Sequence, residues 1–126
     1  MKISHLDHLV LTVADIETTC QFYQSALNFE VITFGENRKA LRFGTQKINL
    51  HQVGKEFEPK ALHPTAGSAD LCFIAETPID EVMAHLHVQN ISIVEGPIQR
   101  TGATGKILSV YLRDPDQNLI EISTFL

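Results

Sequence analysis

The chain has 126 residues and a net charge of −5, with hydrophobic residues at 44% and charged residues at 20%. This length and composition predict one compact globular domain and argue against a disordered chain. The acidic balance disfavours nucleic acid or an anionic membrane as a partner, because phosphate binding needs clustered positive charge. No apolar run approaches the ~20 residues of a membrane-spanning helix, and the two distant cysteines form no disulfide framework. We therefore expect a cytoplasmic protein.

The first half of the chain reads as a strand, a helix and three further strands. Apolar residues alternate from His8 to Val13, which predicts the first strand. Asp15 stands where it can cap the helix that follows. The three short strands are expected at Glu30–Phe34, Lys39–Gly44 and Lys47–Val53.

The same order returns in the second half. A strand begins at Asp70, and Thr77 is placed to cap a helix whose first residue is Pro78. A flexible, positively charged loop is expected over Arg100–Lys106. The three strands of this half are expected at Ser92–Glu95, Ile107–Arg113 and Asn118–Thr124.

This repeated order predicts an α+β fold made of two βαβββ modules. The modules are expected at residues 1–54 and 69–126, and residues 55–68, rich in proline and glycine, form a linker or lid between them. A single module would leave one sheet face bare, so we expect the two to pair within one structural domain. The result would be an open, mostly antiparallel curved sheet with a cleft.

Polar residues recur at equivalent positions of the two modules. Successive side chains of a strand point to opposite faces, so His8, Asn49, His51 and Glu121 all lie opposite the apolar faces of their strands. Superposing the modules sets His8 against Asp70 and Asn49 against Glu121. Imidazole nitrogen and carboxylate oxygen are together the ligands of a divalent first-row metal with open positions. The alternative is an ordinary solvated sheet face, where the same residue types are common.

Further polar residues are placed to bind a small-molecule substrate. Arg42 alternates with apolar neighbours, so we expect it to face the cleft and to hold an anionic group. Asn49, Arg100 and Tyr111 are expected to line the same cleft, although plain packing accounts for Tyr111 equally well.

The twofold βαβββ plan and the segments Leu6–Val13 and Arg113–Ile122 resemble the vicinal oxygen chelate superfamily, over essentially the whole chain. That superfamily includes glyoxalase I, fosfomycin-resistance enzymes, extradiol dioxygenases and bleomycin-resistance proteins. The segments Arg38–Gly44, Lys47–His51 and Val53–Lys60 are more similar still to its glyoxalase-domain-containing protein five subgroup. The resemblance implies a homodimer with its sites at or near the interface.

The resemblance also implies a ligand set. His8 and Glu121 match metal ligands of the family, while its usual fifth-strand histidine is replaced here by Asp70. Its frequent fourth-strand glutamate is replaced by Asn49, with His51 one pleat along on the same face. A complete glyoxalase I set is therefore absent, and the third ligand is either His51 or Asp70.

Three functions follow as hypotheses. The first is a metalloenzyme of lyase, isomerase or dioxygenase type, in which Mn, Fe, Ni, Zn or Mg chelates two adjacent substrate oxygens. Glu121 would be its catalytic residue and would move a proton. The second is a metal-free protein that binds and sequesters an antibiotic or another small molecule. The third is a module used for dimer contacts alone.

Overall fold

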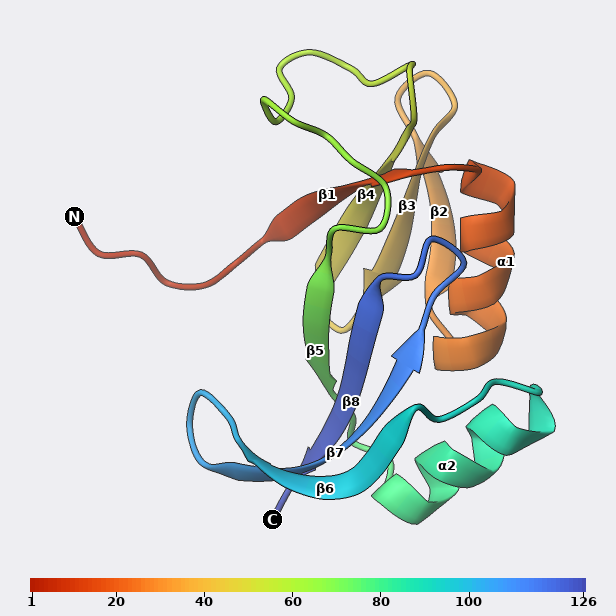
Figure 1. Ribbon diagram of the computed structural model, residues 1–126. Coiled ribbons are helices and arrows are strands. Elements are labelled where there is room, and N and C mark those ends of the chain that lie inside the picture. Colours follow the sequence, from red (N-terminus) through yellow and green to blue (C-terminus); the bar gives the residue numbers. More distant parts are fainter. The chain divides into compact units, whose positions relative to one another are not determined.

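The computed structural model describes residues 1–126, which divide into two compact units, Met1–Gly67 and Ser68–Leu126. Each unit holds one helix and one four-stranded sheet in βαβββ order, so the predicted α+β class is confirmed (Figure 1). Each sheet is mixed, because one of its three strand pairs is parallel and the other two are antiparallel. Neither helix has the length and apolar character needed to span a membrane.

The first unit follows the predicted elements closely. In its sheet, β1 pairs in parallel with β4, and the full order is β1-β4-β3-β2. Asp15 caps the helix as predicted, since its carboxylate accepts a 2.9 Å hydrogen bond from the Thr18 amide. The elements are β1 (His8–Val13), α1 (Ile16–Leu27), β2 (Glu30–Phe34), β3 (Arg38–Phe43) and β4 (Gln46–Gln52).

The helix α1 packs on one face of this sheet and leaves the other face to polar residues. Its contacts are with β2, β3 and β4. Three stacked aromatic rings connect the helix to the sheet. The Phe29 ring lies 5.7 Å from that of Tyr23 on α1 and 4.6 Å from that of Phe43 on β3, between ring centroids. The fully buried side chains of this core are Val13, Tyr23, Leu41, Ile48 and Leu50.

The second unit repeats the arrangement, with β5 parallel to β8 and the order β5-β8-β7-β6. Its helix begins one residue later than predicted. Pro78, rather than Thr77, occupies the cap position and provides no side-chain hydrogen bond. The elements are β5 (Asp70–Ile74), α2 (Ile79–Val88), β6 (Glu95–Thr101), β7 (Lys106–Arg113) and β8 (Leu119–Phe125).

The predicted position of the sixth strand was wrong. The strand is Glu95–Thr101 rather than Ser92–Glu95, so Arg100 lies in the strand and not in a flexible loop. The sequence pattern did not indicate a strand over these residues, because neither Gly96 nor Pro97 favours a strand interior. Here β6 is an edge strand, and a register shift between Glu95 and Ile98 accommodates both residues. Gly96 is also required for close packing, since a Cβ there would lie 2.4 Å from the Ser109 carbonyl oxygen.

A buried polar clamp fixes the parallel edge of the second sheet. The Asp114 carboxylate accepts hydrogen bonds from the amides of Asp116 and Asn118, each 2.9 Å long, and from the Asn118 side chain at 2.8 Å. The Asn118 side-chain oxygen in turn accepts a 2.8 Å hydrogen bond from the Ala69 amide. The turn before β8 therefore holds the start of β5 in register.

Asn118→Ala should destabilise the second unit by about 1–3 kcal/mol, because it removes the buried side chain that accepts from the Ala69 amide and donates to the Asp114 carboxylate. Denaturant unfolding measures the change. Thr104→Ala, in the exposed turn between β6 and β7, is the control and should unfold as the wild type does. Equal stability of the two variants would contradict the clamp.

Candidate functional site

Each sheet has a polar face opposite its helix, and on the first sheet β1 and β4 carry three predicted site residues there. The parallel register of β1 and β4 pairs His8 with Lys47, Val10 with Asn49 and Thr12 with His51. Paired residues share a face. The strand alternation in the sequence therefore assigned these side chains to a common face correctly.

His8 is held by its neighbour in sequence. Its Nδ1 lies 2.8 Å from the Asp7 carboxylate, and its side chain is 44% exposed. This hydrogen bond lowers the pKa of Asp7. It leaves Nε2 of His8 as the nitrogen without a protein partner. A carboxylate on one ring nitrogen fixes the tautomer and orientation of many metal-binding histidines.

Asn49 offers an unused oxygen. The residue is only 6% exposed, and its Oδ1 is buried with no hydrogen-bond partner. Leaving such an acceptor unpaired costs about 1–3 kcal/mol, which makes it rare in native proteins. A hydrogen-bond donor or a cation on this face would satisfy it.

His51 is more enclosed than His8 and lies away from it. It is 4% exposed, and its ring meets the Phe57 ring edge-on at 5.5 Å between centroids. Burial lowers the pKa of His51, and the positive charge of Arg38 adds to the effect. The register sets His51 four residues along the strand pair from His8, a separation of about 13 Å. The register therefore sets the two histidines far apart along the same face.

The second sheet repeats the pattern with carboxylates. Asp70 pairs with Leu119, and Cys72 pairs with Glu121, so Asp70 stands to Glu121 as His8 stands to Asn49. Tyr111 pairs with Glu121 from the other side. A row of three polar side chains therefore crosses the middle of this face.

Hydroxyl groups surround Glu121. Ser123 Oγ donates to Glu121 Oε1 at 3.4 Å and lies 2.7 Å from Ser109 Oγ. Cys72 Sγ lies 3.4 Å from the same Ser123 oxygen. Burial raises the pKa of the Cys72 thiol, and the Glu121 charge adds to this effect. Cys72 is therefore a neutral thiol near pH 7 and not an activated nucleophile.

Tyr111 and Arg100 form the outer part of this face. Arg100 Nε donates to the Tyr111 hydroxyl oxygen at 3.1 Å, and Arg100 Nη2 lies 3.4 Å from Glu95. Burial raises the pKa of Tyr111, and the Glu121 carboxylate raises it further. Tyr111 therefore stays a phenol with a proton to donate beside Glu121.

Arg42 is already paired. Its Nη2 donates to both carboxylate oxygens of Glu30, at 2.7 and 2.9 Å, on the surface of the first sheet. A substrate anion would compete with Glu30 for this guanidinium.

Sequence reasoning missed two other cations on the same face, Arg38 and Lys47. Placing the third strand at Lys39 left Arg38 outside it, although Arg38, Ala40 and Arg42 alternate along the observed strand. Phe57, which meets both Arg38 and His51, comes from the segment read as linker. No pattern in the sequence indicates that Phe57 contacts these two residues.

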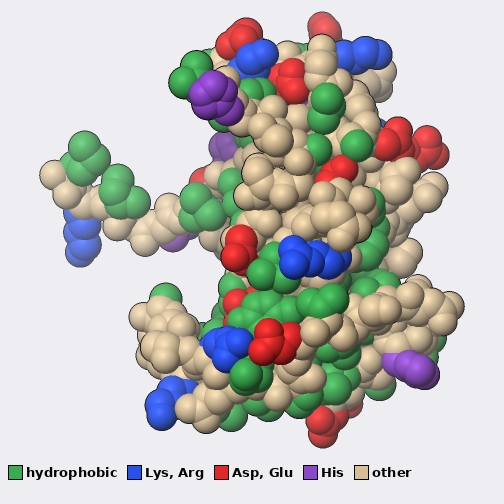
Figure 2. All heavy atoms as spheres, in the orientation of Figure 1, with side chains coloured by type: hydrophobic (Ala, Val, Ile, Leu, Met, Phe, Trp, Pro, Cys, Tyr) green, Lys and Arg blue, Asp and Glu red, His purple; other side chains and the backbone are tan.

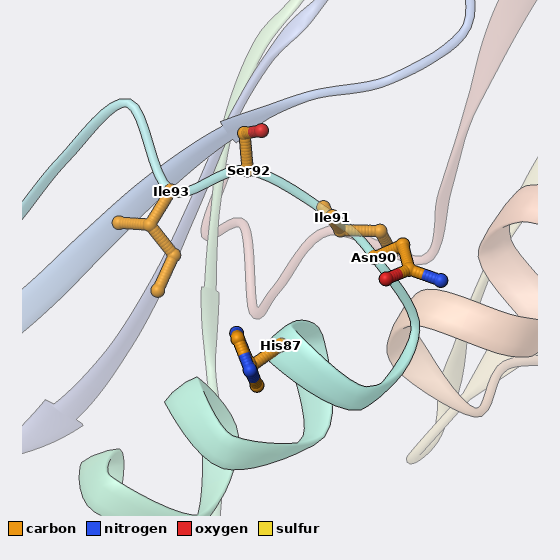
Figure 3. Close-up of a pocket in the computed structure, with 5 residues that line it drawn as sticks. All are labelled: His87, Asn90, Ile91, Ser92 and Ile93. Atoms are coloured by element: carbon orange, nitrogen blue, oxygen red, sulfur yellow. The ribbon is translucent and has the colours of Figure 1, made fainter.

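A pocket of about 420 Å³ lies at the end of α2, and none of the predicted site residues lines it. Its lining is His87, Asn90, Ile91, Ser92 and Ile93 (Figure 3). His87 is its only titratable group, so it offers no metal site. On the molecular face drawn in Figure 2, acidic and basic side chains are interspersed. No three His, Cys, Asp or Glu side chains come together within either unit.

Comparison with known proteins shows close relatives over the full length. The chain is 63% identical over 126 residues to "Virulence protein STM3117" of Salmonella typhimurium strain LT2, covering 100% of this chain and 88% of that protein. The crystal structure of that protein matches with a TM-score of 0.99, covering 100% of each chain. The chain is also 55% identical to "Glyoxalase domain-containing protein RDO1" of Mycosarcoma maydis, covering 99% of this chain and 70% of that protein.

More distant solved structures share the fold alone. A lactoylglutathione lyase from Agrobacterium tumefaciens matches at 20% identity with a TM-score of 0.75, covering 98% of this chain and 95% of that one. The antibiotic-binding protein TnmS3 from Streptomyces sp. CB03234 matches at 20% identity with a TM-score of 0.76, covering 100% and 98%. A family model matches residues 5–122. The chain therefore belongs to the glyoxalase/bleomycin resistance protein/dioxygenase superfamily.

Proposed function

We propose that the protein is a metal-dependent enzyme in which His8, Asp70 and Glu121 bind a divalent ion and Asn49 adds an oxygen ligand. The observation that carries the proposal is the repeated pair. His8 with Asn49, and Asp70 with Glu121, occupy the same two register positions on the polar faces of two repeated sheets. A solvated face gives no reason for such a repeat of nitrogen and oxygen ligands.

The surroundings of these residues fit a cation. Asp7 supports the His8 ring, which is the usual arrangement behind a metal-binding histidine. The buried, unpaired oxygen of Asn49 needs a donor or a positive charge. Glu121 keeps one carboxylate oxygen outside its hydrogen bond with Ser123. One imidazole with three oxygen ligands is a hard set, suited to Mn²⁺, Mg²⁺ or Ni²⁺.

The reaction class follows from the groups beside Glu121. A bound divalent ion would act as a Lewis acid on a small substrate that has two adjacent oxygens. Glu121 accepts a proton from the substrate, and the phenol of Tyr111 donates a hydrogen bond to the charge that develops on oxygen. This is lyase or isomerase chemistry. A dioxygenase using His8 and His51 together is disfavoured by their separation along the strands.

A metal-free binding protein is the second candidate. Within each unit fewer than three potential ligands gather, and His8 is exposed. In this case the protein would sequester an antibiotic or a metabolite; the structural neighbour TnmS3 is an antibiotic-binding protein.

Metal content separates the two candidates. Untagged wild-type protein should carry near-stoichiometric divalent metal, measured by elemental analysis, because the proposed set supplies one nitrogen and three oxygen ligands. His8→Ala, Asp70→Ala and Glu121→Ala should each lose it. His87→Ala and Glu81→Ala, on the surface of α2, are the matched controls and should keep it.

One further variant sharpens this test. Asn49→Asp should tighten Mn²⁺ binding at least about tenfold, because a carboxylate is a stronger ligand than an amide oxygen. Protein that stays free of metal after incubation with Mn²⁺, Ni²⁺, Fe²⁺ and Zn²⁺ would leave only the binding protein.

Stability against pH tests the placement of His51 outside the ligand set. Its folded pKa is lowered from 6.5, so the unfolded chain binds the proton more readily and folding stability falls as pH drops below about 6.5. His51→Gln should flatten this fall in denaturant unfolding, whereas His87→Gln, an exposed histidine, should not. The difference between wild type and His51→Gln should be the same with and without Mn²⁺. A difference that grows when Mn²⁺ is added would make His51 a ligand, because bound metal would then stabilise only the wild type.

A further inference from the structure

Two cations on the polar face of the first sheet converge on one aromatic ring. Lys47 Nζ lies 4.1 Å from the centroid of Phe34, and the Arg38 guanidinium carbon lies 4.9 Å from the same centroid. The Arg38 carbon also lies 4.6 Å from the centroid of Phe57. We call Phe34, Arg38, Lys47 and Phe57 the cation–aromatic cluster.

The strand register explains how the cluster forms. Phe34 pairs with Arg38 across β2 and β3, and Ala40 pairs with Asn49 across β3 and β4. Ala40 is small and fully buried, so the long Lys47 side chain can cross β3 and reach Phe34.

The Arg38 guanidinium lies against two aromatic rings. Its Nε is buried and has no partner, although buried N–H groups are almost always paired. The two aromatic rings hold the guanidinium in place without occupying its donors. An arginine held in this way is prepared to form two parallel hydrogen bonds with a carboxylate or a phosphoryl group.

Three other cations of the first unit have partners. Arg42 pairs with Glu30, Lys60 with Glu56, and Lys39 Nζ donates to Thr33 at 2.7 Å. Arg38 and Lys47 have no ion pair, and both contact aromatic rings instead. The missing element of this face is therefore an anion.

We propose that the cation–aromatic cluster binds the anionic group of a small molecule, a carboxylate or a phosphoryl group carried on an apolar body. Val10 and Phe57 are about half exposed beside it and provide apolar surface for that body. The inference deepens the proposed function, and it rests on that function only in identifying the bound molecule as the substrate. It assigns to Arg38 and Lys47 the role that the sequence suggested for Arg42.

Calorimetric titration of chelator-treated protein tests the cluster directly. Benzoate and inorganic phosphate are the probes, and benzamide is the uncharged counterpart of benzoate. Wild type should bind at least one of the two anions at millimolar concentration and should not bind benzamide. Arg38→Gln and Lys47→Gln should each weaken anion binding at least about tenfold, since each removes a charge-assisted contact. Benzoate binding assigns a carboxylate, and phosphate binding alone assigns a phosphoryl group.

Matched variants control for charge and folding. Lys39→Gln lies on the helix side of β3, and Arg113→Gln lies in the second unit, so both should bind as wild type does. Arg38→Lys keeps the positive charge but loses the planar guanidinium, so it should bind the anion more weakly than wild type. This variant also tests the cluster if Arg38→Gln fails to fold. No binding of either anion, or a loss of binding in Arg42→Gln instead of Arg38→Gln, would overturn the inference.

Metal content distinguishes this inference from the proposed function. Arg38→Gln should keep its metal, because neither cation of the cluster is a ligand. Anion binding without metal would support the cluster and overturn the metalloenzyme. Metal binding without anion binding would overturn the cluster alone.

Discussion

The parallel pairing between the first and last strands of each unit is the constraint on which the candidate site depends. In each unit it sets the start of the first strand beside the start of the last one, two residues before Asn49 in β4 and Glu121 in β8. Side-chain hydrogen bonds hold both pairings at the same place, from Gln46 to the Leu6 carbonyl in the first unit and from the Ala69 amide to Asn118 in the second. A slip of one residue would turn every polar side chain of the strand toward the core.

The two polar faces share a framework and differ in chemistry. The first presents histidine, amide and unpaired cations beside aromatic rings. The second presents a carboxylate surrounded by the hydroxyl groups of Ser109, Tyr111 and Ser123. In the function proposed above, the first repeat binds an anionic group and the second moves a proton. A duplicated scaffold permits this division because the helix-side core of each unit is independent of its polar face.

Local signals made most of the fold predictable from the sequence. Strong alternation and the Asp15 cap located the first-unit elements within a residue or two, and β5, β7 and β8 were located equally well. The edge strand β6 was not predictable, because its pairing with β7 outweighs the preferences of Gly96 and Pro97. Alternation also assigned faces, but not distances along the sheet. The separation of His8 from His51 depends on the β1–β4 register, which only long-range pairing defines.

The buried oxygen of Asn49 has a consequence for how ligands of this protein can be found. Burial of that oxygen without a hydrogen-bond partner lowers the free energy of unfolding, compared with a fold in which the oxygen is paired. A molecule that supplies the missing contact returns that free energy on binding, and mass action converts it into a higher melting temperature. Thermal-shift screening of a metabolite collection therefore reports occupancy of this face before any reaction is known.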